Sequence, residues 1–252
     1  MNNQVKRKKK RIILIVIIIV IGISVFFLMN PIRSLLAIIT MKPLETGEVF
    51  QDVYAVRNSF NNLYLLKSGE KYIAFDGGSD NKATKSALDD LGIDINDITA
   101  IFLTHTDHDH TAAVTLFTSA EIYMADSNRI FLEHAEGLNR SKAFLSGNGV
   151  KYQTLQDGET VTIGDTEIQC IFTPGHTPGS ACYIADGNIL FAGDNFNLKN
   201  NKAVLFNDIF NMDNYEQERS IRKLAKLENI EAVFTMHTGC ATDFKAAFSD
   251  WF

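Results

Sequence analysis

Three histidines and two aspartates lie within six consecutive residues of this chain. They belong to the segment Thr-His-Thr-Asp-His-Asp-His at residues 104–110, and the whole chain of 252 residues has only six histidines. Imidazole nitrogens and carboxylate oxygens are the ligands that zinc and other divalent metals take in proteins. A polar, solvated loop is the plain alternative, but half of the histidines would then have gathered there by chance. The segment therefore predicts a metal site.

Four short apolar runs elsewhere in the chain are predicted strands, and each is followed by a turn that presents an aspartate or a histidine. The residues at these turns are Asp76, His176, Asp194 and His237, which follow short apolar runs at residues 71–75, 166–172, 188–192 and 232–236. Taken singly, each has an ordinary interpretation as a turn residue or a buried histidine. Strand ends at one edge of a pair of sheets can converge, however, so together with residues 104–110 they predict one pocket.

The order of these motifs resembles that of the metallo-β-lactamase superfamily over about residues 47–240. That family shows Asp-x-Gly, Thr-His-x-His-x-Asp-His, Pro-Gly-His, Gly-Asp and a closing Gly-His. The corresponding segments here are Asp76-Gly-Gly78, Thr104 to His110, Pro174-Gly-His176, Gly193-Asp194 and Met236-His-Thr-Gly239. The resemblance implies an α/β fold, a four-layer αββα sandwich with two divalent metal ions, usually zinc, at one edge.

The resemblance also implies a role for each motif residue. It assigns ligands to two metal ions: His105 and His176 to the first, and Asp109, His110 and His237 to the second. Asp194 would bridge the two ions, and Asp76 would hold the surrounding loops as a hydrogen-bond acceptor. The implied nucleophile is a hydroxide between the metals. Asp109 would orient it and pass its proton to the leaving group.

Two positions depart from the family pattern. Met236 stands where the family has the glycine before its closing histidine, which weakens the assignment of His237. Asp107 stands where the family has its second histidine. Either Asp107 is a carboxylate ligand in place of an imidazole, or His108 binds the metal instead. The register of the rest of the motif favours Asp107, with His108 facing away.

A ligand at Asp107 would change the charge of the metal centre. With three carboxylates and a hydroxide around two divalent ions the formal charges cancel, whereas two carboxylates would leave one positive charge. A neutral centre polarises a carbonyl less, and oxygen ligands tolerate harder ions such as manganese. We therefore expect zinc, with manganese as the alternative, and weaker metal retention or a higher working pH than with histidine.

The first 46 residues differ in composition from the rest. Residues 1–11 end in six consecutive Lys and Arg residues, and residues 12–29 are 18 uncharged residues, nearly all Ile, Val, Leu or Phe. As a helix they would extend about 27 Å, close to the hydrocarbon core of about 30 Å. The run is longer than the apolar part of a cleaved signal peptide. We predict a basic cytoplasmic tail at 1–11, a transmembrane anchor at 12–29 and a linker at 30–46.

The charge distribution supports this division. Residues 1–42 hold eight of the 24 Lys and Arg residues and none of the 30 Asp and Glu residues, which leaves 16 basic and 30 acidic residues and a formal charge of −14 on the remainder. Basic flanks stay cytoplasmic. This predicts a single-pass cell-membrane protein with its catalytic domain, residues 47–252, on the extracytoplasmic side. An acidic domain without a basic patch excludes nucleic acid as a partner.

Three cysteines are too few for a disulfide framework. Cys170 and Cys182 lie symmetrically about His176 on neighbouring predicted strands, and Cys240 lies near the end of the chain. One disulfide between Cys170 and Cys182 is one alternative, and two buried free thiols are the favoured one.

Together these patterns predict a membrane-anchored hydrolase that cleaves an ester, thioester, lactone or related acyl bond of a small-molecule or envelope-derived substrate. One alternative is a phosphodiesterase for a cell-envelope or lipid phosphodiester. Another is a non-catalytic, metal-stabilised binding module, which the ligand set disfavours because structural zinc sites are closed and rich in cysteine. The substrate pocket is predicted to be lined by residues 57–62, 138–148 and 196–210, which carry no motif for a substrate.

Overall fold

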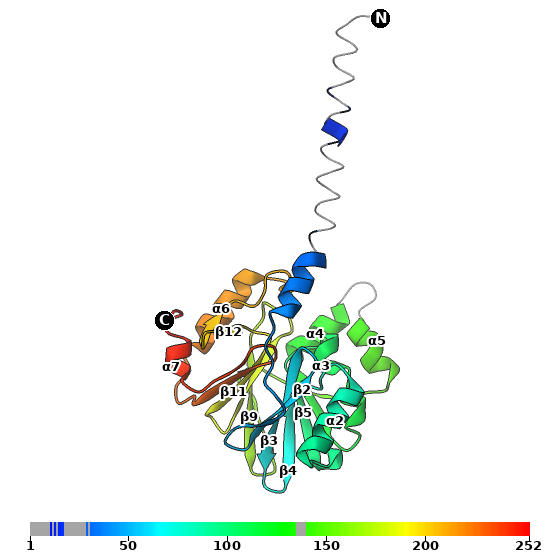
Figure 1. The fold of residues 1–252 in the computed structure, drawn as a ribbon. Helices are drawn as coiled ribbons and strands as arrows, with labels where there is room; N and C mark the ends of the chain where they lie inside the picture. The colour runs from blue at the N-terminus through cyan, green and yellow to red at the C-terminus, as the bar shows by residue number, and fades with distance from the viewer. Residues whose placement is uncertain (1–10, 12, 14, 18–28, 30, 135–139) are drawn as a thin grey trace, which may run out of the picture. The chain divides into compact units, whose positions relative to one another are not determined.

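The computed structural model describes residues 11, 13, 15–17, 29, 31–134 and 140–252 (Figure 1). It contains two compact units, Met1–Thr40 and Met41–Phe252. In the first unit, residues 31–39 are helical. No helix within the described ranges is both long and apolar enough to cross a membrane. Most of the predicted anchor at 12–29, and nearly all of the basic tail, lie outside those ranges, so both stay predictions.

Two β-sheets form the centre of the unit Met41–Phe252. The first sheet has seven strands in chain order: β1 (Gly47–Phe50), β2 (Val53–Asn58), β3 (Asn61–Ser68), β4 (Lys71–Phe75), β5 (Ile98–Leu103), β6 (Glu121–Ala125) and β7 (Gln153–Leu155). Neighbours from β1 to β4 are antiparallel, and those from β4 to β7 are parallel. The carboxyl ends of β4 and β5 therefore meet at one edge.

The second sheet has the strand order β15-β14-β11-β10-β9-β8. Its strands are β8 (Thr160–Ile163), β9 (Thr166–Phe172), β10 (Ala181–Ala185), β11 (Ile189–Gly193), β14 (Ala232–Thr235) and β15 (Gly239–Ala241). Only the pair of β11 and β14 is parallel, so their carboxyl ends also lie side by side. A separate hairpin joins β12 (Asn197–Lys199) to β13 (Lys202–Val204).

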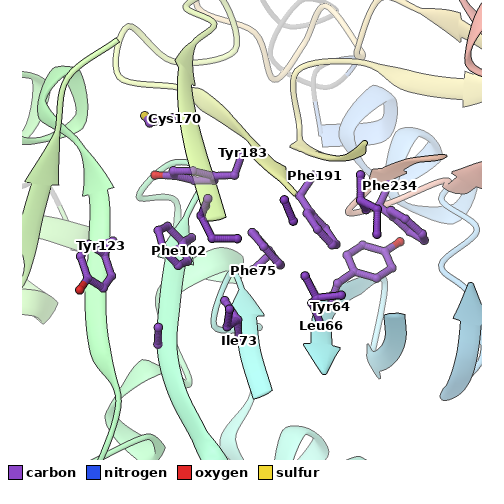
Figure 2. Packing of buried hydrophobic residues seen from close by; sticks show 14 of the residues in the cluster. Tyr64, Leu66, Ile73, Phe75, Phe102, Tyr123, Cys170, Tyr183, Phe191 and Phe234 are labelled. Carbon is purple, nitrogen blue, oxygen red and sulfur yellow. The ribbon is translucent and has the colours of Figure 1, made fainter. Parts of the chain in front are cut away.

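Aromatic side chains fill the space between the two sheets (Figure 2). Phe75 of β4 stacks on Phe191 of β11, with ring centroids 3.6 Å apart and planes inclined by 7°. The buried hydroxyl of Tyr64 donates to the carbonyl of Thr235 at 2.8 Å, and that of Tyr183 donates to the carbonyl of Leu103 at 2.9 Å. Because Leu103 and Thr235 end the strands that precede the histidine-bearing turns, these bonds fix one sheet edge against the other.

Helices cover the outer faces of both sheets, which makes the mixed α/β sandwich that the sequence predicts. The first sheet carries α2 (Asn81–Leu91), α4 (Asp126–His134) and α5 (Arg140–Gly147), and the second carries α6 (Asn214–Leu224) and α7 (Phe244–Ala247). Three short helices lie in connections: α3 (His108–Thr111), η1 (Ile95–Asp97) and η2 (Val114–Leu116). The packing order is therefore helices, sheet, sheet, helices.

The helical spacing of residues 81–91 and the glycine at position 92 predict a helix that ends there, and α2 confirms this. Asp80 caps α2 by accepting the amide of Ala83 at 2.7 Å, and Gly92 ends it with φ 68°. The composition of residues 49–56 favours one strand, but this prediction was wrong, because a turn at Asp52 with φ 62° separates β1 from β2.

Two predictions about helices were also wrong. Thr111 is a plausible N-cap by residue type and predicts a helix that starts there, but α3 begins at His108 and Thr111 is its last residue. The polar stretch at 136–148 was predicted as a surface excursion, but α5 occupies most of it. Its neighbours Phe144 and Leu145 both pack against the first sheet, and two adjacent apolar positions do not give the spacing that marks a helix.

The cysteines do not form a disulfide. The register pairs Cys170 with Tyr183 and Cys182 with Ile171, so the two thiols point to opposite faces of the second sheet. Cys170 packs between the sheets, whereas Cys182 packs on the side that α6 covers. All three cysteines are free, and burial raises the pKa of both the Cys170 and the Cys182 thiol to about 12.

Candidate metal centre

The turns that follow five strands meet at one edge of the sandwich. They present side chains that are almost fully buried: Asp76 after β4, His105 and His110 after β5, His176 after β9, Asp194 after β11 and His237 after β14. Gly193 permits one close approach, because it has φ 54° and an added Cβ would lie 2.3 Å from Thr104 Oγ1. The end of β11 can therefore come directly against the β5 turn.

A first ligand cluster consists of His105, His176 and Asp194, whose ligand atoms all lie within 4.8 Å of one another. The Nε2 atoms of His105 and His176 are 3.1 Å apart. Asp107 reaches the same cluster, with Oδ2 3.6 Å from His105 Nε2 and 3.4 Å from His176 Nε2. Burial alone would raise the pKa of Asp107, but its two histidine neighbours lower it well below the usual range.

A second ligand cluster consists of Asp109, His110 and His237, with ligand atoms again within 4.8 Å. Asp109 Oδ2 lies 3.8 Å from His110 Nε2 and 3.4 Å from His237 Nε2. Asp194 lies between the clusters, because its Oδ2 is 3.7 Å from His176 Nε2, 3.5 Å from His110 Nε2 and 3.2 Å from His237 Nε2.

The structure also places the two residues that depart from the family pattern. His108 is exposed and lies edge-on to Phe144 at 6.2 Å, outside both ligand clusters. Met236 is buried in the core between the sheets, and its amide donates to the carbonyl of Gly193 at 3.2 Å. The methionine side chain is thus accommodated away from the centre, and His237 still points into the second cluster.

Each of the four clustered histidines has a partner at Nδ1. The partners are Thr104 Oγ1 for His105 (3.2 Å), Asp76 Oδ2 for His110 (3.0 Å), Asn211 Oδ1 for His176 (3.3 Å) and the Phe60 carbonyl for His237 (2.9 Å). The carboxylate and the carbonyl only accept, so Nδ1 of His110 and of His237 carries the proton. Nε2 of each is then the atom that faces the clusters, where a metal ion would take the place of its proton.

Asp76 holds the β5 turn as well as His110. Its Oδ1 accepts the amide of Thr104 at 2.8 Å, and its Oδ2 accepts the Thr104 hydroxyl at 2.8 Å. Because the single hydroxyl proton of Thr104 is used in this bond, its oxygen accepts from His105 Nδ1. One carboxylate therefore orients ligands of both clusters. Asp76 itself has φ 65°, a conformation that aspartate tolerates better than most residues.

Sequence reasoning did not find several of the supporting residues. Asn211 bonds to His176 from 35 positions away, and Asn61 Nδ2 donates to the carbonyl of Asp109 at 2.7 Å from 48 positions away. Phe60 supplies a backbone carbonyl, which any residue could do. Such contacts have no spacing that a motif could encode, so the sequence gives no signal for them.

Opposite charges in this centre shift each other's pKa values strongly. Burial acts to lower the pKa of His110, but Asp76, Asp194 and Asp109 outweigh it and raise that pKa well above the usual value. Burial is likewise outweighed at His237, where Asp194 and Asp109 raise the pKa to about 10. Burial acts to raise the pKa of Asp194, but His237 and His110 hold it well below its usual range.

The donor set fits two divalent metal ions. Among the described residues, His110 Nε2 and Asp194 Oδ1 are buried without any hydrogen-bond partner, and both belong to the clusters. Burying an unpaired polar atom is costly, and a metal ion would satisfy the histidine nitrogen. Nitrogen and carboxylate donors without a thiolate are typical of catalytic rather than structural zinc sites.

We predict that Asp76→Asn weakens metal binding by about 10- to 100-fold, as loss of a partner behind a ligand commonly does. The amide presents only one acceptor oxygen to the three groups that the carboxylate holds. Competition with a chromogenic chelator measures the affinity. Asp90→Asn, at an exposed position of α2, is the matched control and should bind as the parent does. Equal affinities of Asp76→Asn and the parent would contradict this role.

We also predict that the metal-free protein loses stability as the pH rises above neutrality. The folded-state pKa of His237 is about 10, against an ordinary value of 6.5, so its contribution is complete below pH 6.5 and is lost as the pH approaches 10. The free energy of unfolding should fall by on the order of 1 kcal/mol per pH unit. Urea unfolding with a chelator, at one pH near neutrality and one near the folded-state pKa of His237, measures it.

The matched variants for this measurement are His237→Gln and His134→Gln. The first should flatten the pH dependence, whereas the second alters an exposed histidine at the end of α4 and should leave it unchanged. The same slope in both variants would show that His237 does not carry the effect.

Proteins of known family support the same assignment. The family model described as the metallo-beta-lactamase superfamily matches residues 56–237. A probable polyketide biosynthesis zinc-dependent hydrolase from Bacillus subtilis is 33% identical over 101 residues, 39% of each chain. A hydroxyacylglutathione hydrolase from Rhizobium etli is 30% identical over 56% of this chain and 48% of its own length. The matches thus span about half or less of these two relatives.

Solved structures show the same fold. A metallo-beta-lactamase family protein from Thermus thermophilus superposes with a TM-score of 0.63 at 20% identity, over 81% of this chain and 79% of its own. A B3 metallo-beta-lactamase described as having an active site glutamic acid superposes with a TM-score of 0.60 at 19% identity, over 83% and 86%. With the two ligand clusters and the family match over residues 56–237, these likenesses show that the chain belongs to the metallo-β-lactamase superfamily.

Proposed function

We propose that this protein is a metal-dependent hydrolase that cleaves an ester, thioester, lactone or related acyl bond. The observation that carries the proposal is the pair of ligand clusters that share Asp194. Two bound divalent ions, zinc or else manganese, would supply a nucleophilic hydroxide near neutral pH and polarise the substrate carbonyl. One relative is named for hydrolysis of hydroxyacylglutathione, which is a thioester, and this favours an acyl substrate.

The distances support the ligand roles that we propose. We assign His105, His176 and Asp107 to the first ion, Asp109, His110 and His237 to the second, and Asp194 to both. His108, which is exposed, has no role in this scheme. The assignment of Asp107 is supported by its position between His105 and His176. A B3 metallo-beta-lactamase of the same fold is described as having an active site glutamic acid, which is a precedent for an additional carboxylate.

We propose that Asp109 moves a proton during the reaction. Its side chain is 25% exposed, whereas those of His110, His237 and Asp194 are almost fully buried. Burial acts to raise its pKa, but the neighbouring His110 and His237 lower it, so the carboxylate is ionised and can accept a proton. The hydrogen bond from Asn61 Nδ2 to the carbonyl of Asp109 holds the backbone from which the Asp109 side chain extends. Asp109 can therefore orient the nucleophile and return the proton to the leaving group.

The proposal also includes anchoring by residues 12–29, with the catalytic domain on the extracytoplasmic side. The path of the chain into the domain supports a substrate from the envelope. The amide of Lys42 donates to the carbonyl of His237 at 2.7 Å, and Asn62 bonds to both backbone groups of Leu44. Lys42 follows the predicted anchor by 13 residues.

The proposed activity predicts about two divalent ions per purified chain and turnover of chromogenic acyl esters or thioesters. Asp109→Asn should lower kcat by about 10²- to 10⁴-fold, the usual size of a general acid-base contribution. Asp165→Asn, at an exposed turn, is the matched control and should retain kcat. Elemental analysis and steady-state kinetics on the full-length protein make the measurement. Turnover of phosphodiesters alone would favour the phosphodiesterase, and one ion without turnover would favour a binding module.

The proposed role of Asp107 predicts the effect of replacing it by histidine. Asp107→His should retain metal better against a chelator and shift the pH–rate profile to lower pH, because it removes one negative charge from the centre. Asp107→Asn removes the same charge without adding an imidazole, so it separates the effect of charge from that of ligand type. Metal content after dialysis and the pH dependence of kcat/KM are the measurements. Identical curves for Asp107→His and the parent would exclude Asp107 as a ligand.

A further inference from the structure

Aromatic rings pack directly against the metal-ligand histidines. Phe206 is 3% exposed and lies edge-on to His176, with ring centroids 5.1 Å apart, and 5.7 Å from His237. Phe60 stacks almost parallel on His237 at 5.7 Å and 11°. Phe210 continues this surface 6.2 Å from Phe206. Apolar groups therefore border the ligand clusters from the β2–β3 turn and from the segment between β13 and α6.

The segment at residues 205–212, between β13 and α6, also exposes apolar side chains. Met212 is 60% exposed and Leu205 is 38% exposed, and Ile209 and Phe210 are half-buried. Single exposed apolar residues are ordinary, but several in one short segment beside a catalytic centre indicate a binding surface.

Hydrogen bonds fix this segment to the turns that carry the ligands. The amide of Met212 donates to the carbonyl of His176 at 3.0 Å, and the amide of Phe206 donates to Gln217 Oε1 at 3.0 Å. Gln217 is fully buried in α6, and its Nε2 donates to the carbonyl of Asp194 at 3.3 Å. The apolar side chains are thus held at set positions relative to both ligand clusters.

The charges around the ligand clusters also favour an apolar substrate group. Every ion pair that the described residues form with Asp76, Asp107, Asp109 or Asp194 joins the carboxylate to a histidine and not to a lysine or arginine. The contacts seen beside the clusters therefore suit an uncharged, apolar group better than a carboxylate or a phosphate.

We propose that Phe60 and residues 205–212 form an acyl-binding wall, and that the substrate carries an apolar acyl chain of several methylenes. The chain would lie on Phe210 and Met212, with its carbonyl over the ligand clusters, and the buried Phe206 would support Phe210. This inference rests on the proposed acyl hydrolysis and names its substrate class. A fatty acyl chain of a soluble ester and one of a membrane lipid have the same chemistry at this wall.

The first test measures kcat/KM for p-nitrophenyl esters from acetyl to octanoyl, with full-length protein at one fixed detergent concentration. The value should rise about two- to fourfold per methylene, the size expected for partial to full burial. Phe210→Ala and Met212→Asp should lower the octanoyl-to-acetyl ratio by about tenfold or more. Phe252→Ala, at a 73% exposed position at the end of the chain, is the matched control and should keep the parent's ratio.

The second test does not depend on catalysis. Titration of octanamide and acetamide into chelator-treated protein should show tighter binding of octanamide, and Phe210→Ala should remove most of that preference. Thermal unfolding of each variant identifies any that fails to fold. If Phe210→Ala fails to fold, Met212→Asp, at an exposed position, replaces it in both tests.

The outcomes separate this inference from the proposed function. Ester turnover with the same kcat/KM along the series, or the same ratio in Phe210→Ala and Phe252→Ala, would overturn the wall while leaving the hydrolase in place. Absence of any ester turnover, with octanamide still preferred, would overturn the hydrolase and keep the wall. Release of free fatty acid from phosphatidylcholine in vesicles would identify a lipid as the source of the chain, and turnover of the soluble ester alone would identify a soluble amphiphile.

Discussion

The buried carboxylate of Asp194 has to be paired with histidines that come from both sheets. Its Oδ2 lies within 3.7 Å of the Nε2 atoms of His110, His176 and His237. His110 follows a strand of the first sheet, whereas Asp194 and His237 follow strands of the second. A buried charge without partners is very costly, so the two sheets can pack only in the one arrangement that brings these groups together.

The aromatic core is what holds that arrangement. Phe75 and Phe191 stack in the strands that lead to Asp76 and Asp194. The hydroxyls of Tyr64 and Tyr183 cross to the other sheet just below the turns, so a sliding motion of one sheet would break both bonds. Interiors packed at this density resist small displacements. The distances between ligand atoms therefore depend on residues that never touch them.

Much of this could be predicted from the sequence, because the residues concerned act locally. The strand-then-turn pattern around Asp76 and Asp194, and the caps at Asp80 and Gly92, lie within a few positions of the feature they specify. Contacts that cross long separations could not be predicted. Asn211 behind His176 and Gln217 behind Asp194 depend on α6 folding back over the second sheet, and no spacing in the chain records that. The exposure of His108, by contrast, could be predicted, because the register of the motif at residues 104–110 puts Asp107 on the metal side and His108 on the opposite side.

The bond from Lys42 to His237 has a mechanical meaning. The backbone that leads into the domain is hydrogen-bonded to His237, whose imidazole belongs to the second cluster, and Asn62 holds Leu44 two residues later. Tension or displacement along this leader would therefore reach His237 before it reached any strand of the core. A chain shortened to begin at the first strand would leave the His237 carbonyl and the Asn62 amide without these partners, so residues 42–44 help to hold the backbone that carries His237.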